Sequence, residues 1–232
     1  MRILYWFIAC FFVLSCAPEK KVETVAVLGD SYSTFYGYIP EGNDCWYYSV
    51  PQGENDVVNV EQTWWHLFCH EGGYELVLNE SFSGSTICNT GYDGVDYKDR
   101  SFITRMTNIT SLEELPDLIL IFGGTNDSWA DSPVGELVYE NWSPEDMYSC
   151  LPACCFMLEH LTTEAPESII IVLMNTEIKE EITVGIKQAC DHYGVHFLQL
   201  QDIEKKWGHP SVKGMEQIKD QLQRFLAEVK YL

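Results

Sequence analysis

Five short apolar runs are spaced along the chain, with helical patterns between them. The runs show no alternation of polar and apolar residues, which is typical of parallel strands buried on both faces. Strands that alternate with helices through right-handed crossovers predict an α/β fold, a three-layer α/β/α sandwich around a five-stranded parallel sheet. The predicted strands are Val25–Leu28, Glu75–Asn79, Leu118–Phe122, Ser168–Leu173 and Val195–Leu200.

Two of the predicted helices begin with recognisable caps. Ser143 precedes Pro144 and two acidic residues, the pattern of an N-cap serine followed by proline at the first helical position. This helix is expected to run towards Leu161, with a bend or break near Pro152. Ser211 caps the last helix, whose apolar positions at helical spacing are Met215, Ile218, Leu222, Phe225 and Val229.

Two long loops, Tyr32–Glu61 and Thr90–Thr104, interrupt this plan. Both follow strand ends, and long loops in a compact domain are usually functional. The first loop is rich in tyrosine and contains Trp46. The second contains Asp93, Asp96 and Asp99, which match no EF-hand spacing, so a solvated acidic loop is preferred to a calcium site.

Residues 1–15 have the layout of a bacterial lipoprotein signal peptide. Arg2 precedes an apolar stretch that is too short to span a bilayer comfortably, and Val13-Leu14-Ser15-Cys16 resembles a lipobox. We therefore predict cleavage before Cys16 and lipidation of its thiol, with an ordinary signal peptide or an uncleaved anchor as alternatives. The protein would then be exported and anchored in the cell envelope, on the periplasmic or cell-surface face.

The rest of the chain divides into a lipidated tether at residues 16–24 and a single domain at residues 25–232, long enough for a full core. The full chain is strongly acidic, with 14 Lys and Arg against 35 Asp and Glu and a formal charge of −21. This balance argues against a nucleic-acid partner and against charge-driven docking on anionic lipid.

The chain has nine cysteines, of which seven remain when Cys10 and Cys16 are set aside. An odd number cannot be fully paired within the chain, and no spacing matches a Cys-x-x-Cys metal or redox site. We interpret these cysteines as mostly structural, with at most one or two disulfides.

Four short motifs carry the candidate chemistry. Ligands bind at the carboxyl ends of strands in open α/β sheets, so motifs at these ends are expected to meet. Each has an ordinary alternative: Asn126 as a turn residue, Gly84 as turn punctuation, and His209 as a residue that merely precedes a helix. The presence of all four motifs in a fixed order along the chain favours a catalytic site over four coincidences. The motifs are Gly29-Asp30-Ser31, Ser83-Gly84-Ser85, Gly123-Gly124-Thr125-Asn126-Asp127 and His209-Pro210.

With these motifs the chain resembles the SGNH or GDSL-type hydrolases, esterases and lipases named for a serine, a glycine, an asparagine and a histidine in four blocks. The resemblance covers roughly residues 25–225 and implies a strand order of 2-1-3-4-5. It assigns Ser31 as the nucleophile and His209 as the general base. The oxyanion donors would be the backbone N–H groups of Ser31 and Gly84 and the side-chain amide of Asn126. No cofactor and no metal ion are implied.

One position departs from the family pattern. The family usually places an aspartate three residues before the histidine, whereas this chain has Lys206, whose ammonium cannot accept the imidazole N–H. Asp202, Glu204 or a main-chain carbonyl would have to orient His209. We expect a main-chain carbonyl, a Ser–His dyad, and a lysine that points to solvent, so that Lys206→Asp raises the rate.

These features predict an exported serine esterase that cleaves a carboxylic ester through an acyl-serine intermediate. The substrate would be an acetylated glycan or a short-chain lipid ester. Trp46, Trp129 and Trp142 are candidates for an aromatic rim that suits a sugar ring or an acyl chain. The alternative is a non-catalytic glycan-binding lipoprotein on the same fold, in which Lys206 marks lost activity.

Overall fold

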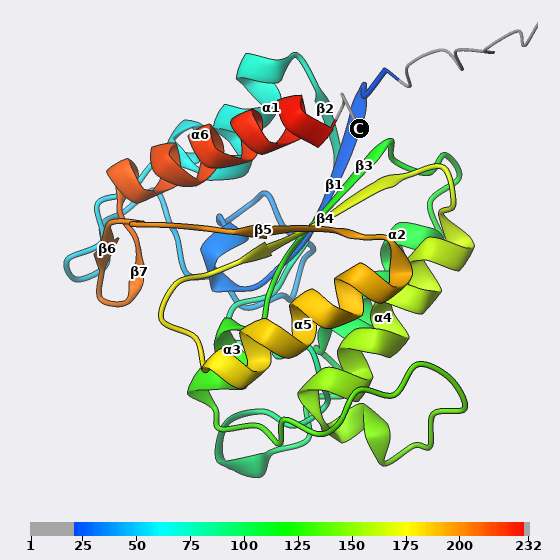
Figure 1. Ribbon diagram of the computed structural model, residues 1–232. Coiled ribbons are helices and arrows are strands. Elements are labelled where there is room, and N and C mark those ends of the chain that lie inside the picture. Colours follow the sequence, from blue (N-terminus) through cyan, green and yellow to red (C-terminus); the bar gives the residue numbers. More distant parts are fainter. Residues whose placement is uncertain (1–20, 230–232) are drawn as a thin grey trace, which may run out of the picture.

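The computed structural model describes residues 21–229 of the chain. Its centre is a five-stranded parallel sheet in the order β2-β1-β3-β4-β5 (Figure 1). The predicted strands and their order are confirmed, with strand ends shifted by one or two residues. The strands are β1 (Thr24–Gly29), β2 (Glu75–Ser81), β3 (Leu118–Phe122), β4 (Ile169–Met174) and β5 (His196–Gln199).

Helices cover both faces of the sheet, as predicted for the sandwich (Figure 1). One face carries α1 (Trp64–Gly72) and α6 (Val212–Val229), which pack against each other. The other face carries α2 (Phe102–Thr110), α4 (Cys150–Glu164) and α5 (Glu180–Tyr193). Each face has its own apolar cluster, because every residue of the central strand β3 is buried and its side chains point alternately to the two faces.

The last helix follows its predicted apolar face in part. Ser211 Oγ accepts the N–H of Gly214 at 3.2 Å, which confirms the cap. Three predicted core positions are fully buried, but Phe225 and Val229 are only partly buried, and Leu226 lies in the core instead. Leu226 follows Leu222 by four residues, so both side chains lie on the same side of the helix.

The helix predicted to start at Ser143 is two separate elements. A 3-10 turn, η4 (Asp146–Tyr148), is followed by extended backbone at Ser149, and α4 begins only at Cys150. Ser143 donates to the carboxylate of Asp146, but this contact closes a turn rather than starting a helix. The reason is Pro152, which lacks an N–H and clashes with the carbonyl four residues earlier, so it is tolerated in the first turn of a helix and not inside one.

All seven cysteines within residues 21–229 are free thiols, and the disulfides that the sequence allowed are not formed there. Five of them line the apolar cluster between the sheet and α4, where they serve as small core residues. The predicted signal peptide and Cys16 lie outside the described residues. Within the part of the chain that the structure describes, no helix is long and apolar enough to cross a membrane.

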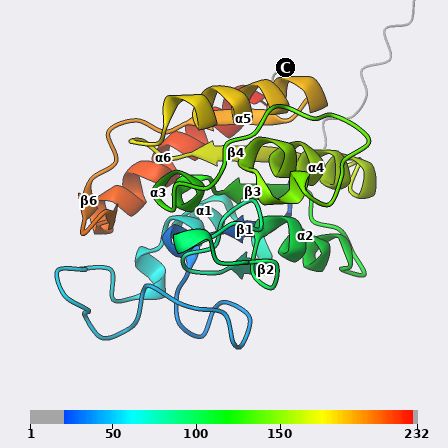
Figure 2. The same ribbon diagram turned by 90° about the horizontal axis from the view of Figure 1, so that it is seen from below.

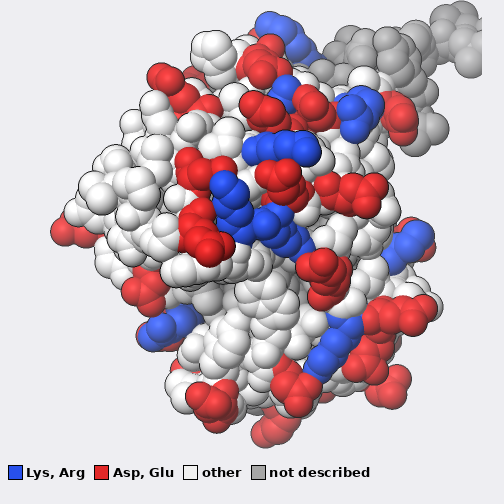
Figure 3. All heavy atoms as spheres, turned by 90° about the vertical axis from the view of Figure 1, so that its left-hand side faces the viewer, with Lys and Arg blue, Asp and Glu red and all other residues white. Residues whose placement is uncertain are grey.

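Two features of the surface bear on function. The loop formed by residues 34–59 extends from one side of the molecule (Figure 2). On the face that carries α6 and the hairpin of β6 (Lys205–Lys206) and β7 (His209–Pro210), basic side chains lie beside acidic ones rather than in a separate basic patch (Figure 3).

Candidate active site

The nucleophile candidate Ser31 lies directly after β1, at the carboxyl edge of the sheet. Gly29 makes the sharp exit possible, because a Cβ there would lie only 2.5 Å from Ser81 Oγ. Asp30 then caps the 3-10 turn η1 (Ser31–Ser33), its carboxylate accepting the N–H of Tyr32 at 2.9 Å. The Gly-Asp-Ser sequence therefore folds locally into a tight turn that carries Ser31.

Ser31 and His209 meet in the structure. Ser31 Oγ lies 2.9 Å from His209 Nε2, and both residues are buried. The other ring nitrogen, Nδ1, lies 3.1 Å from the carbonyl oxygen of Trp207. A carbonyl only accepts, so Nδ1 carries the proton and Nε2 is free to accept from the Ser31 hydroxyl. The expectation that a main-chain carbonyl orients the imidazole is confirmed.

A tight hairpin that the sequence analysis did not predict builds this arrangement. β6 and β7 pair antiparallel, with Lys206 opposite His209. The two turn residues, Trp207 and Gly208, have φ of 50° and 74°, as in the two-residue type I′ turn that matches strand twist. The hydroxyl of Tyr47 donates to the carbonyl of Pro210 at 2.9 Å and holds the hairpin against the 34–59 loop.

The side chain of Lys206 does not simply point to solvent, contrary to our expectation. Its ammonium pairs with Asp56 at 2.7 Å, and the same carboxylate accepts the N–H of Val212 at the start of α6. Each carboxylate that we considered as a substitute is also placed away from the triad role. Glu204 accepts the hydroxyl of Ser211 at 2.7 Å, and Asp202 lies on an exposed turn at φ 52°.

Gly84 and Asn126 lie on the strand ends that flank β1. Gly84 has φ 81°, which favours glycine, and no atom lies within 4 Å of the position that a Cβ would occupy. The Asn126 amide donates to the carbonyl of Ser85 at 3.0 Å and accepts the hydroxyl of Tyr92 at 2.8 Å. These two bonds fix the orientation of the amide and leave its second N–H available as a donor.

Arg105 is a connecting residue that the sequence analysis missed. Its buried guanidinium donates to the carbonyl of Gly29 at 3.1 Å and to Ser85 Oγ at 2.9 Å. It therefore joins the turn before Ser31 to the turn that contains Gly84. Burial lowers the pKa of Arg105 to about 10, so the group remains a cation at neutral pH. An arginine inside a helical pattern gives no sequence signal of this role.

Two buried carboxyl groups, those of Asp127 and Asp30, also hold the turns around the site. Asp127 accepts the N–H groups of Ile87 at 2.8 Å and Cys88 at 3.3 Å, which anchors the segment after Gly84. Burial raises the pKa of Asp30 to about 7, although the Tyr32 N–H and the positive charge of Arg105 act in the opposite direction. Both carboxyl groups accept backbone N–H groups of the turns around the site, and their role is therefore to position these turns.

The electrostatic environment favours a neutral imidazole. Burial lowers the pKa of His209 to about 4; the hydrogen bond to the Trp207 carbonyl opposes this shift, and the nearby ammonium of Lys205 adds to it. A histidine with this pKa is unprotonated at neutral pH. It is therefore in the form that a general base requires.

Aromatic rings surround the dyad. The indole of Trp46 stacks on the His209 ring, and Trp129 meets the same ring edge-on with centroids 6.0 Å apart. Trp129 is 42% exposed and forms part of a rim beside the dyad. The third candidate, Trp142, was wrongly included: it packs against Phe156 and donates to the carbonyl of Val138.

Two of the three acidic loop residues contact neighbouring side chains. Asp96 accepts the hydroxyl of Tyr148 at 3.1 Å, and Asp99 pairs with Arg100 at 3.0 Å. Within residues 21–229 no group of His, Cys, Asp and Glu side chains is arranged to hold a metal ion.

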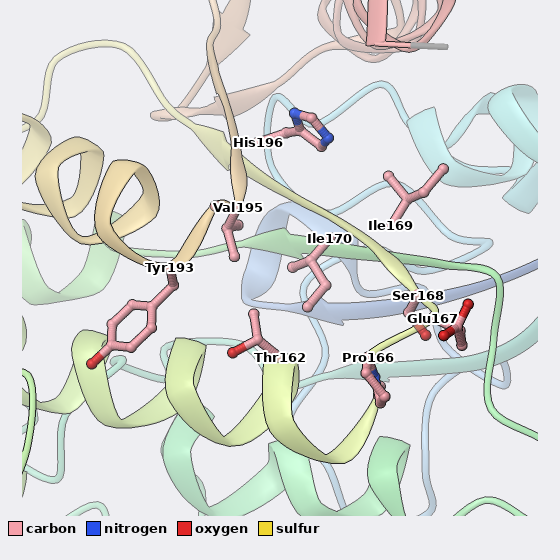
Figure 4. Close-up of a pocket in the computed structure, with 11 residues that line it drawn as sticks. Thr162, Pro166, Glu167, Ser168, Ile169, Ile170, Tyr193, Val195 and His196 are labelled. Atoms are coloured by element: carbon pink, nitrogen blue, oxygen red, sulfur yellow. The ribbon is translucent and has the colours of Figure 1, made fainter. Parts of the chain in front are cut away.

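A separate cavity lies at the opposite, amino-terminal edge of the sheet (Figure 4). It is lined by the segments that lead into β4 and β5, residues 165–170 and 193–196, together with Thr162. None of the four motifs contributes to it. The candidate site residues therefore lie at the carboxyl edge, away from this cavity.

Comparison with known proteins agrees with this geometry. The sequence model described as GDSL-like Lipase/Acylhydrolase matches residues 23–226, whereas no curated protein shows significant similarity to the chain. Crystal structures of two candidate GDSL-like lipases are each 48% identical. The protein from Bacteroides ovatus has a TM-score of 0.85 and coverage of 90% of this chain and 100% of that one. The protein from Bacteroides uniformis has a TM-score of 0.84 and coverage of 89% and 96%.

A more distant structure shares the fold alone. It is a carbohydrate acetylesterase family member from Sinorhizobium meliloti, 15% identical, with a TM-score of 0.57 and coverage of 90% of this chain and 100% of that one. The sequence match spans nearly all of the described domain, and the close structures share its architecture. The chain therefore belongs to the GDSL-like lipase/acylhydrolase family of ester hydrolases.

Proposed function

We propose that the protein hydrolyses a carboxylic ester through an acyl-serine intermediate on Ser31. The observation that carries this proposal is the dyad itself: Ser31 Oγ lies 2.9 Å from His209 Nε2, while the Trp207 carbonyl binds the proton on Nδ1. A hydroxyl is too weak an acid to attack an ester unaided, and a neutral imidazole at this distance is a competent base.

The chemistry proceeds in two halves. His209 takes the hydroxyl proton as Ser31 Oγ attacks the carbonyl carbon, and the tetrahedral intermediate carries its negative charge on the former carbonyl oxygen. The N–H groups of Ser31, Gly84 and Asn126 are the proposed donors to that oxyanion, and removing one such donor typically raises a barrier by about 3–4 kcal/mol. The imidazolium then protonates the departing alkoxide. Water attacks the acyl-serine by the same route and releases the acid.

We propose an acetylated carbohydrate as the substrate. The side chain of Trp129, which is 42% exposed, lies beside the dyad, and aromatic faces suit sugar rings. The fold-level similarity to a carbohydrate acetylesterase family member is compatible with this choice. Export and lipidation at Cys16 are part of the same proposal, and they would hold the active site at the cell envelope.

The test is hydrolysis of p-nitrophenyl acetate by the domain without its signal peptide. Ser31→Ala should lower kcat by at least about four orders of magnitude, because the nucleophile is removed. Ser33→Ala is a matched control two residues away, since the Ser33 hydroxyl has no hydrogen-bond partner. This control should keep the activity of the parent protein.

Two further measurements separate the alternatives. Release of acetate from acetylated xylan, compared with release from a short-chain glyceride, tests the carbohydrate proposal. A parent protein that neither turns over the ester nor labels with a fluorophosphonate at Ser31, yet is retarded by a glycan in affinity electrophoresis, would instead be the non-catalytic binder.

A further inference from the structure

The indole of Trp46 stacks on the imidazole of His209, and the proposed mechanism assigns this contact no role. The two ring centroids lie 3.6 Å apart and the planes differ by 9°, so the indole lies flat on the imidazole. Edge-on or offset contacts are the commoner arrangement among aromatic pairs. Trp46 comes from the 34–59 loop, far from His209 in sequence.

The structure holds Trp46 in place from both sides. The backbone N–H of Trp46 donates to Thr34 Oγ1 at 2.9 Å, just after the nucleophile turn. The next residue, Tyr47, is buried and bonds through its hydroxyl to Pro210, which directly follows His209. Further along the loop, Asp56 pairs with Lys206 in the same hairpin. The loop therefore ties Trp46 both to the Ser31 side and to the His209 side of the site.

The reaction creates a charge in front of this indole. When His209 accepts the Ser31 proton, the imidazole becomes an imidazolium inside a buried site. In a complete triad a carboxylate stabilises that cation, but the residue at the usual position is Lys206 and the Nδ1 partner is a neutral carbonyl. The titratable groups that face the ring are the phenols of Tyr32 and Tyr47 and the ammonium of Lys205, which repels a cation.

A tryptophan face is the strongest aromatic partner for a cation. The ring centroids lie 3.6 Å apart, well within the distance at which cation–π attraction operates, and His209 is buried. The same stacking prevents the imidazole from rotating away from Ser31. Simple core packing would require only volume at this position, whereas this role requires an electron-rich face.

We propose that Trp46 is a positioning residue of the dyad, which fixes the plane of the His209 ring and stabilises the imidazolium formed when Ser31 attacks. This inference rests on the proposed esterase function. It assigns the neutral indole of the 34–59 loop to the task that a triad aspartate performs in other family members.

The experiment compares Trp46→Leu and Trp46→Phe with the parent protein on p-nitrophenyl acetate. Trp142→Leu is the matched control, because it removes an indole of the same domain that packs on Phe156 away from the dyad. Rates are expressed per active site, counted by fluorophosphonate labelling of Ser31, so that loss of folded protein does not lower them. Trp46→Leu should lower kcat by roughly 3- to 30-fold with little change in KM, and Trp46→Phe should fall between it and the parent.

A second readout follows the cation directly. In the phosphonylated adduct the polar phosphonyl oxygen takes the place of the oxyanion of the tetrahedral intermediate, and the His209 titration is observable by NMR. Its midpoint should fall by roughly 0.4 to 1.5 pH units in Trp46→Leu, because the imidazolium loses its π partner. The midpoint in Trp142→Leu should match the parent.

An unchanged kcat and an unchanged midpoint in Trp46→Leu, with an active parent, would overturn the role of Trp46 alone. If Trp46→Leu does not fold, the same two measurements on Trp46→Phe decide, and a value equal to the parent in both rejects the proposal. A parent that shows neither turnover nor labelling would overturn the proposed function and this inference together.

Discussion

At the residue scale, the pKa of His209 is set by its burial, because no carboxylate within residues 21–229 contacts its ring. His209 is 7% exposed, and its polar contacts are the Ser31 hydroxyl and the Trp207 carbonyl. In a triad the negative charge of an aspartate would raise the imidazole pKa, whereas a carbonyl dipole does so only weakly. Desolvation therefore dominates, and the imidazole is a weak base that is neutral at neutral pH.

We expect kcat/KM for a neutral ester to remain on its plateau well below pH 6 and to fall with a midpoint near pH 4. The base must be neutral, and burial lowers the pKa of His209 to about 4 from its ordinary 6.5. A pH profile of p-nitrophenyl acetate hydrolysis, corrected for the ionisation of the product, measures the midpoint. A midpoint near 6.5 would mean that the ring is solvated in the working enzyme.

The control for that profile is folding stability at each pH. Between pH 6.5 and 4 the unfolded chain binds a proton at His209 and the folded protein does not. The contribution of His209 to stability therefore falls as the pH is lowered through this window, whereas that of Asp30, whose pKa burial raises to about 7, changes in the opposite sense. Near-UV circular dichroism, recorded at each pH, separates loss of the fold from protonation of the base.

At the element scale, Asp56 joins three parts of the chain. Its carboxylate caps α6 through the N–H of Val212 at 3.0 Å and pairs with Lys206 of the β6–β7 hairpin, while its own segment belongs to the 34–59 loop. The loop, the hairpin that carries His209 and the last helix therefore share one anchor. This arrangement changes the prediction that we made for Lys206 from the sequence.

Lys206→Asp should not raise the esterase rate. The new carboxylate would face Asp56, and like charges repel, while the Nδ1 proton of His209 is already bound by the Trp207 carbonyl. We expect kcat no higher than that of Lys206→Met, which removes the ammonium without adding an anion. Steady-state kinetics of the two variants provide the measurement, and a clear gain in Lys206→Asp alone would show that the site accepts a third member.

At the scale of the whole molecule, the sheet brings together residues that are distant in the chain. β1 lies between β2 and β3, so the turns that carry Ser31, Gly84 and Asn126 leave neighbouring strands at one edge. On the face that carries α6 and the β6–β7 hairpin, acidic and basic side chains intermingle (Figure 3), in a chain with a formal charge of −21. Among the described residues, no separate basic patch is visible on that face.

The prediction at this scale concerns attachment. If Cys16 carries a lipid anchor, Cys16→Ser should release the protein from the membrane fraction or leave an unprocessed precursor, because the lipidated side chain is lost. Fractionation followed by Triton X-114 partitioning of parent and variant measures this. Cys10→Ser is the matched control within the signal sequence, and unchanged processing and partitioning of Cys16→Ser would contradict the anchor.

The sequence by itself determined the strands, the α/β class and the four motif residues. Buried parallel strands need continuous apolar runs, and those runs are visible without any tertiary contact. Ser31 and His209 were identified because a short motif at a strand end and a histidine before the last helix match a family pattern. Their 2.9 Å contact depends in addition on the β6–β7 hairpin, which the sequence analysis did not predict.

Only the tertiary structure decided the immediate surroundings of the dyad. The stacking of Trp46, the pair of Lys206 with Asp56 and the links made by Arg105 all depend on the paths of loops, which have no periodicity to read. A side chain's partner across such a loop is set by the packing of the whole domain. The sequence thus determined which residues are candidates for the chemistry, and the tertiary structure decided what holds the histidine in place.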